Sequence, residues 1–347
     1  MLYYSNTLPC LCSNRISVYD GRIMRPTFIP RLVNTERFDP VVFVRILNEK
    51  RAILFDCGRI EGLANKELLE LDAIFISHTH MDHFMGIDQV LRTILHREKP
   101  LHIYGPQGIT EKMLAKLHAY TWNLTKDYAL EIDIHEILDH TILSTRTLAS
   151  SGFHAVSRHD QGRHGHTIAR DPRYHVDAVI LDHTIPCLGF VIKERIHVNM
   201  RGEVISSRGY IPGPWIGRLK ECILSGETQT PLEVITGSGT VTIPADKLTH
   251  ELVIITRGQK IAFFTDIACT RENIRKIRSI ALDADVLFIE AYYLDEMRSQ
   301  AAVRGHLTAR QAGMIARRLR AKRVFPMHVS PRYHLMLDEI YAEMDMQ

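Results

Sequence analysis

Short apolar runs of strand length alternate with segments of helical periodicity along most of this chain. The runs typical of buried β-strands are Val41–Leu47, Ala52–Phe55, Ala73–Ile76, Leu101–Tyr104, Val253–Thr256, Ile261–Phe264, Val286–Ile289 and Val324–Met327. Helical spacing is found at Met85–His96, Thr110–His118, Arg271–Ile280 and Thr308–Arg320. The last of these opens with Thr308-Ala-Arg-Gln311, which is a capping-box pattern. The alternation predicts a layered α/β protein.

Five of the predicted strands are followed by a side chain that can bind a metal or move a proton. These side chains are Asp56, His78, Asp266, Glu290 and His328. A single Asp after a strand is more often a turn former or a helix cap. Because ligands collect at strand ends in layered α/β proteins, five such positions together indicate one shared site.

The segment His78-Thr-His80-Met-Asp82-His83 places three imidazoles and a carboxylate within six residues, directly after a predicted strand. His78 and His80 suit one metal ion, and Asp82 and His83 suit a second. Nitrogen and carboxylate ligands without thiolate favour zinc, with manganese or iron as lesser options. Two such ions form the clamp used to hydrolyse phosphodiesters and acyl bonds. The alternative is a histidine-rich surface loop.

Two stretches interrupt the alternation of strands and helices. His154–His175 is rich in histidine and arginine without periodicity, which favours a solvated loop over a metal or RNA contact. Lys193–Glu221 has six Lys or Arg against three Glu, weak periodicity and an exposed-looking Trp215. We expect residues 193–230 to form an inserted basic arm that is mobile without RNA, because protruding basic segments suit phosphate backbones.

Composition bounds the class of protein. The chain has 347 residues, 45% hydrophobic and 24% charged, which are ordinary globular values. A net charge of +3 does not by itself indicate a nucleic-acid binder. Six scattered cysteines favour a reduced, cytoplasmic chain, and neither a signal peptide nor a membrane span is expected. We expect one domain over residues 1–347.

With these residues in view, the chain from about Val41 to Tyr333 resembles the metallo-β-lactamase superfamily. Within it, the chain resembles the ribonuclease Z branch, the tRNA 3′-processing endonucleases. The motifs that carry the resemblance are His78–His83, His183–Phe190 with Glu194, Phe264-Thr-Asp266 and Met327–Tyr333. Two further segments are more specific to the branch, namely Glu290-Ala291 followed by Gly305-His306, and Pro212–Lys220.

The resemblance implies a four-layer αββα fold with a protruding flexible arm and two Zn²⁺ per chain, Mn²⁺ or Fe²⁺ being the alternatives. It assigns His78, His80 and His183 to one ion, and Asp82, His83 and His328 to the other. Asp266 would bridge the two ions. Asp82 would orient the attacking hydroxide, and Glu290 would orient His306 as general acid for the leaving group. Asp56 would orient a ligand rather than bind metal.

The same resemblance implies removal of 3′ trailers from precursor tRNA by a homodimer. Ser330 and Arg332 would contact the scissile phosphate, and Gly213, Pro214 and Lys220 of the arm would contact the RNA. The basic helix after Thr308 would either contact phosphates or be a solvated face. Two alternatives stay open: a small-substrate metallo-phosphodiesterase with the insertion as a lid, and a catalytically idle RNA-binding scaffold.

Overall fold

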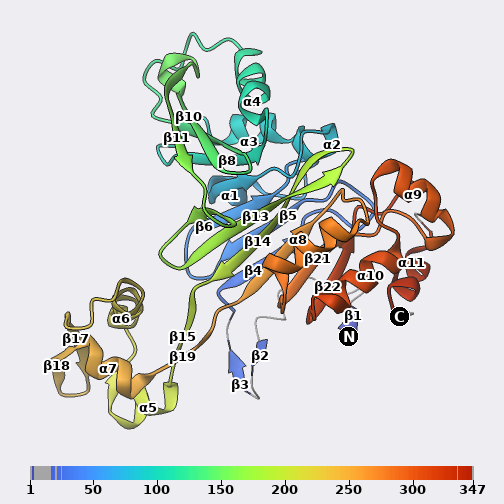
Figure 1. Ribbon diagram of the computed structural model, residues 1–347. Helices are drawn as coiled ribbons and strands as arrows, with labels where there is room; N and C mark the ends of the chain where they lie inside the picture. The colour runs from blue at the N-terminus through green and yellow to red at the C-terminus, as the bar shows by residue number, and fades with distance from the viewer. Residues whose placement is uncertain (1, 4–16, 20–21, 25, 334, 346–347) are drawn as a thin grey trace.

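Two β-sheets face each other at the centre of the molecule (Figure 1). The computed structural model describes residues 2–3, 17–19, 22–24, 26–333 and 335–345. In spatial order, the eight-stranded sheet consists of β11 (Ala155–Gly162), β10 (Thr141–Leu148), β9 (Glu131–Ile137), β8 (Leu101–Pro106), β7 (Leu71–Phe75), β6 (Arg51–Phe55), β5 (Val42–Ile46) and β4 (Phe28–Leu32). The seven-stranded sheet consists of β1 (Leu2–Tyr3), β22 (Arg323–Met327), β21 (Val286–Glu290), β20 (Lys260–Phe264), β14 (Ile185–Glu194), β13 (Tyr174–His183) and β12 (Thr167–Arg170). A separate pair joins β2 (Ser17–Tyr19) to β3 (Arg22–Met24).

The two sheets are held together by aromatic rings from both. Phe55 of β6 stacks on Phe190 of β14 and Phe263 of β20, with centroids 5.8 and 5.5 Å away. Along β20, Ile261 and Phe263 face this inner layer, whereas Ala262 and Phe264 face the outside of the sheet, where helices cover them. Because both faces are buried, β20 is a continuous apolar run rather than an alternating one.

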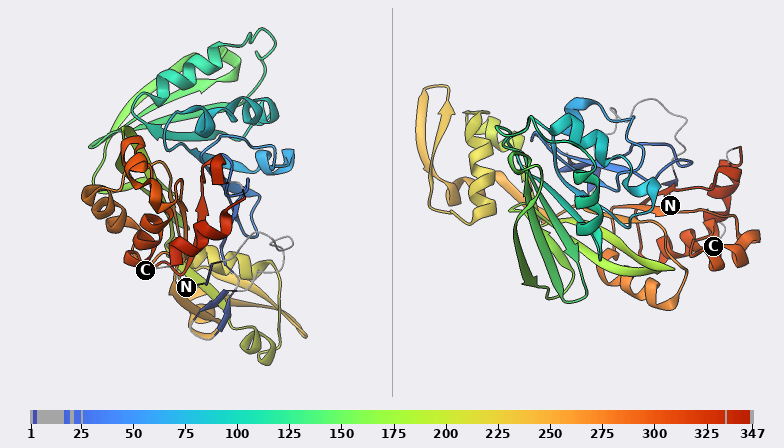
Figure 2. Two further views of the ribbon diagram at one scale, coloured as in Figure 1. Left: turned by 90° about the vertical axis from the view of Figure 1, so that its right-hand side faces the viewer. Right: turned by 90° about the horizontal axis from the view of Figure 1, so that it is seen from above.

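Helices cover the outer face of each sheet and complete four layers (Figure 2). On the eight-stranded sheet lie α1 (Asn65–Leu69), α3 (Ile87–Ile94) and α4 (Ile109–His118). On the seven-stranded sheet lie α8 (Arg271–Ala281), α10 (Ala309–Arg318) and α11 (Leu337–Asp345). The predicted αββα architecture is confirmed, as is the capping box, in which Thr308 accepts from the backbone N–H of Gln311. Two short helices, α2 (Met81–Phe84) and α9 (Arg298–Arg304), lie near the sheet edge.

A second unit projects from the sheets, and we call it the arm (Ile196–Arg257) (Figure 1, Figure 2). An antiparallel ribbon of two strands connects it to the body, with Ile196 paired to Arg257 and Met200 paired to Val253. In chain order, the arm consists of β15 (Ile196–Met200), α5 (Gly202–Ser207), β16 (Tyr210–Ile211), α6 (Pro214–Ser225), β17 (Pro231–Thr236), β18 (Gly239–Pro244), α7 (Ala245–Leu252) and β19 (Val253–Arg257).

The arm differs from the sequence expectation in three ways. The expected interval, 193–230, covers only its first part, and Val253–Thr256 is a strand of its ribbon rather than of a central sheet. Trp215 is 4% exposed and packs with Leu219, Leu248 and other residues in a separate hydrophobic core, so the expectation of an exposed Trp215 was wrong. The arm as a whole has six Lys or Arg and six Asp or Glu, so its first part is basic but the unit is not.

The histidine-rich stretch 154–175 is also not a loop. It forms β11 at the edge of the eight-stranded sheet and β12 at the edge of the other. Every residue of β11 is solvent-exposed, which explains why no apolar pattern predicted the strand. Its pairing with β10 depends on backbone hydrogen bonds and leaves the side chains to solvent. Within the described residues, no helix combines the length and apolarity needed to cross a membrane.

Candidate metal centre

The predicted strand-end residues meet at one edge of the two sheets. Asp56 directly follows β6, and Glu290 is the last residue of β21. Asp266 lies two residues past the end of β20, and His328 directly follows β22. Asp56, Asp266 and His328 have positive φ angles of 55°, 51° and 54°. Non-glycine residues there cost about 1–3 kcal/mol each, and such strain is concentrated at functional sites. The sharp turns direct these three side chains back across the strand ends.

The residues predicted as metal ligands lie in overlapping groups. His78, His80 and His183 offer ligand atoms within 4.8 Å of one another, and so do Asp82, His83 and His328. These are the two sets that the family resemblance assigned to separate ions. His80 precedes α2, and Asp82 and His83 lie within it, so the helix presents them next to the strand ends.

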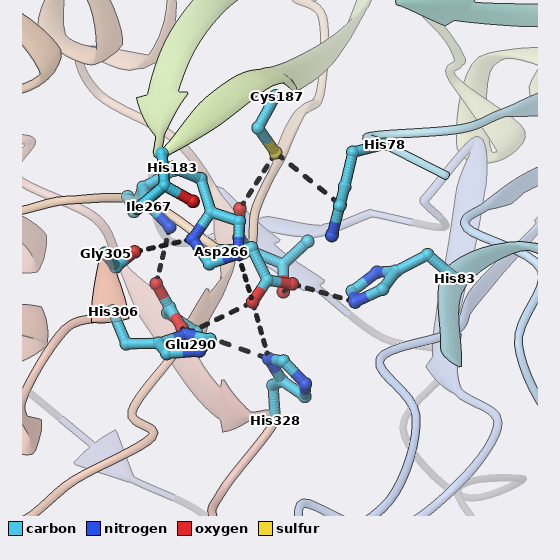
Figure 3. A network of polar contacts seen from close by, with 12 residues as sticks. His78, His83, His183, Cys187, Asp266, Ile267, Glu290, Gly305, His306 and His328 are labelled. Carbon is cyan, nitrogen blue, oxygen red and sulfur yellow. Dashed lines mark hydrogen bonds and ion pairs between the residues drawn. The ribbon is translucent and has the colours of Figure 1, made fainter. Parts of the chain in front are cut away.

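Asp266 lies between the two sets. One carboxylate oxygen, Oδ2, is 2.8 Å from Nε2 of His83. The other, Oδ1, is 3.3 Å from Nδ1 of His328 and 3.6 Å from Nε2 of His183 (Figure 3). The side chain is almost fully buried, at 2% exposure. The carboxylate therefore lies against members of both sets, with Oδ1 shared between His183 and His328, which is the position expected of a bridging ligand.

Three imidazole nitrogens of this cluster are buried and make no well-oriented hydrogen bond, although those of His83 and His328 lie 2.8 and 3.3 Å from Asp266. They are Nε2 of His78, Nε2 of His83 and Nδ1 of His328. An unsatisfied buried polar atom costs about 1–3 kcal/mol, and most buried polar atoms are satisfied. Three together are explained if each nitrogen binds a cation. The donors are imidazole and carboxylate, which are typical ligands of zinc.

The protonation states also suit a cation. Burial and the neighbouring His83 lower the pKa of His78 to about 2, so its ring is neutral and can bind metal. Burial opposes ionisation of Asp82, but hydrogen bonds from His328 and His83 outweigh it and lower its pKa. Cys187 lies 3.9 Å from His78, yet burial and Asp266 raise the pKa of its thiol. It therefore stays protonated and is a poor ligand.

A layer of outer hydrogen bonds orients the imidazoles. Asp56 accepts from Nδ1 of His83 at 2.7 Å and from both the backbone and the hydroxyl of Ser77. Nδ1 of His183 donates to the carbonyl of Gly305 at 2.7 Å. Gly305 has φ of +70°, and a Cβ there would lie 3.1 Å from His183, so glycine suits this position. Each contact turns the opposite ring nitrogen toward Asp266, and the expected orienting contact of Asp56 is confirmed.

The predicted pair Glu290 and His306 is assembled beside Asp266. Nδ1 of His306 donates to Glu290 at 2.8 Å, and the other oxygen of Glu290 accepts from the backbone of Ile267 at 2.7 Å. Burial lowers the pKa of His306, but Glu290 and Asp266 outweigh it and raise the pKa to about 10. The imidazole is therefore held protonated, with Nε2 left for a proton transfer.

The sequence did not single out Tyr292, which lies at the same site. Its ring stacks on His306 with centroids 4.1 Å apart and planes 11° apart. It also lies 5.1 Å from His328, and its carbonyl accepts from the backbone of Ser330. The sequence feature that could have pointed to Tyr292 is its place two residues after Glu290, the acid at the end of a predicted strand.

The residues predicted to contact substrate are distributed differently. Ser330 is buried beside Tyr292, and the guanidinium of Arg332 lies over the ring of Tyr293, 5.4 Å from its centroid. Gly213 and Pro214 begin helix α6 of the arm, away from the centre. Lys220 of the same helix lines a cavity at the base of the arm.

Three basic residues of the segment after Thr308 are paired with acids from other elements. Arg310 forms an ion pair with Asp295 at 3.3 Å, and Arg320 forms one with Asp283 at 2.7 Å. Lys322 lies 2.8 Å from Asp285. These pairs favour a solvated, ion-paired face over a dedicated phosphate-binding surface.

Comparison with known proteins agrees with this geometry. A family model described as beta-lactamase superfamily domain matches residues 51–198 and 221–329. Ribonuclease Z of Bacillus cereus is 30% identical over 302 residues, which cover 84% of this chain and 83% of that protein. Ribonuclease Z of Deinococcus radiodurans is 29% identical over 290 residues, which cover 81% of this chain and 83% of that protein. Zinc phosphodiesterase ELAC protein 1 of Homo sapiens is 28% identical over a match that covers 81% of this chain and 78% of that protein.

A solved structure, the short form of human tRNase Z, shares the fold. Its TM-score is 0.51 at 19% identity, and the match covers 88% of this chain and 93% of that one. The matched share shows that the likeness extends over most of both chains and is not limited to the strand ends.

Proposed function

This chain belongs to the metallo-β-lactamase superfamily, in its ribonuclease Z branch, and on that premise we propose that it removes 3′ trailers from precursor tRNA. The observation that carries the proposal is the Glu290–His306 pair beside the cluster around Asp266. A phosphodiester with a ribose 3′ oxygen as leaving group needs a proton donor, whereas activated small substrates do not. A protonated imidazole held by a buried acid supplies one.

The site fits two zinc ions, which we assign to the two ligand sets on either side of Asp266. His78, His80 and His183 would hold one, and Asp82, His83 and His328 the other. When bound, such ions lower the pKa of water and neutralise charge on phosphoryl oxygens. The orphaned nitrogens of the cluster and the relatives named zinc phosphodiesterase support this assignment.

Asp82 and His306 divide the proton chemistry between them. The Asp82 side chain is 42% exposed, which sets it apart from the nearly buried His83 and Asp266, so it faces incoming water and substrate. As an ionised carboxylate it orients the attacking water and accepts its proton. His306 then donates a proton from Nε2 to the leaving 3′ oxygen, and Glu290 stabilises the charge on the ring while it is protonated.

We assign substrate recognition to Ser330 and Arg332 at the centre and to Gly213 and Pro214 on the arm. Strand β14 has ten residues, or about 33 Å, and the arm leaves from the end opposite His183. An arm that starts so far from its own centre is better placed to serve the centre of a second copy. We therefore propose a homodimer in which each arm grips the RNA cleaved by the partner.

A small-substrate phosphodiesterase of the same fold is the second candidate, and the balanced charge of the whole arm favours it. The test is to compare the metal-loaded protein on precursor tRNA and on bis-p-nitrophenyl phosphate. We expect a precise cut at the 3′ end of the tRNA, with kcat/KM for precursor tRNA far above that for the small diester. Hydrolysis of the diester without cleavage of precursor tRNA would replace our proposal with the second candidate.

A further inference from the structure

A cavity of about 510 Å³ lies where the arm meets the body. Its floor comes from the body, from the turn after β5 and from the ends of β13 and β14, and its wall comes from β15 and helix α6 of the arm. It lies at the end of β14 opposite the candidate metal centre. A volume of this size is typical of small-molecule sites.

The cavity brings together two cations from different units. Lys220 projects into it from α6, and Arg173 projects into it from the body. Both side chains line the cavity, and burial and the charge of Arg173 lower the pKa of Lys220. Arg173 is paired with Glu49 at 2.7 Å. In the part of the chain that the structure describes, Lys220 has no carboxylate at ion-pair distance.

Glu194, the acid that lines the same cavity, is already engaged by other groups. Glu194 accepts from the hydroxyl of Thr27 at 2.5 Å, from the backbone of Gln259 at 2.8 Å and from Nδ1 of His197 at 3.0 Å. These bonds fix Glu194 at the cavity wall. Of the two cations that line this cavity, Arg173 has an ion-pair partner, and Lys220 has none among the described residues.

We propose that this cavity binds a small phosphate ester whose phosphate bridges Lys220 of the arm and Arg173 of the body. A phosphate offers enough acceptors for an ammonium and a guanidinium at once. The apolar part of the ligand would rest on Leu47 of the body and Leu224 of α6, which lies four residues after Lys220 on the same face. Because the contacts come from both units, the bound ligand holds the arm at one angle to the sheets. The inference is independent of the substrate proposed for the metal centre.

The arm provides its own reporter for a test. The chain has two tryptophans, and Trp215 lies in α6, five residues before Lys220. In a metal-loaded Trp122→Phe protein, Trp215 fluorescence is titrated with inorganic phosphate and with 5′-AMP. We expect a saturable change with both, tighter for 5′-AMP because of the apolar wall.

Substitutions at Lys220 then test whether the fluorescence change comes from binding in this cavity. On the Trp122→Phe background, Lys220→Ala should raise the Kd for 5′-AMP at least tenfold, while Lys220→Arg keeps it within about threefold because the charge remains. Lys247→Ala is the matched control, since Lys247 is an exposed lysine of α7 that does not line the cavity. Circular dichroism establishes that each variant is folded. An unchanged Kd in folded Lys220→Ala, or no saturable change with either probe, would overturn the proposal.

Discussion

The strand-end cluster and the arm are built on opposite principles. The cluster gathers buried polar groups from at least five strand ends and from α2, and Asp266 contacts both sets of histidines. The arm packs its own apolar residues around Trp215 and joins the body through one two-stranded ribbon. A site assembled from many elements tolerates little change at any of them. A unit with its own core and one connection can be altered or removed with little effect on the cluster, so chemistry and recognition should be separable by mutation.

The largest effect is expected from Asp266→Ala. It removes the carboxylate that lies between the two ligand sets and leaves His83 and His328 without their shared neighbour. We expect loss of bound zinc by elemental analysis together with loss of hydrolysis of both precursor tRNA and bis-p-nitrophenyl phosphate. Asp127→Ala, at an exposed aspartate, is the control. Full activity in Asp266→Ala would contradict a bridging role.

His306→Ala is expected to separate chemistry from metal binding. The variant should retain both zinc ions but cleave precursor tRNA about 10²- to 10⁴-fold more slowly, the usual effect of losing a general acid. The loss should be much smaller on bis-p-nitrophenyl phosphate, because p-nitrophenolate leaves without a proton. His164→Ala is the control at an exposed histidine. Equal losses on the two substrates would rule out proton donation by His306.

An intermediate effect is expected from Asp56→Asn, which keeps the size of the side chain but removes the charge that orients His83. Outer contacts of this kind are typically worth about 10- to 100-fold in metal affinity. A chelator titration should show weaker binding of one zinc, with Asp127→Asn as the control. If both ions bind with normal affinity, Asp56 serves the fold alone.

The smallest effect is expected from Tyr292, whose ring stacks on His306. An aromatic pair contributes about 0.5–1.5 kcal/mol, so Tyr292→Leu should lower kcat for precursor tRNA about two- to tenfold while KM changes little. Tyr292→Phe keeps the stacking and should restore the rate. Tyr120→Leu, at an exposed tyrosine, controls for general loss of stability. A change in KM alone would show that Tyr292 contacts the substrate instead of positioning His306.

The two regions also differ in how far the sequence could predict them. The cluster was predictable because the ligands lie next to strands whose apolar runs are continuous, as with Asp266 after Ile261–Phe264. The arm was not, because its core joins residues as distant along the chain as Ile205 and Leu252. Strand β11 was missed for a related reason, since its side chains are exposed and only its backbone is paired. Periodicity detects burial within one element and does not detect contacts between distant segments.

Removing the arm tests the separation of chemistry from recognition most directly. The backbone N–H of Arg201 donates to the carbonyl of Leu252 at 2.7 Å, so a short Asn-Gly turn can replace residues 202–251 and close the ribbon. The measurement is kcat/KM for precursor tRNA and for bis-p-nitrophenyl phosphate, in the intact protein and in this variant. The account predicts a loss of at least about tenfold on precursor tRNA, which corresponds to about 1.4 kcal/mol, and an unchanged rate on the small diester. Unchanged tRNA cleavage, or equal losses on both substrates, would contradict it.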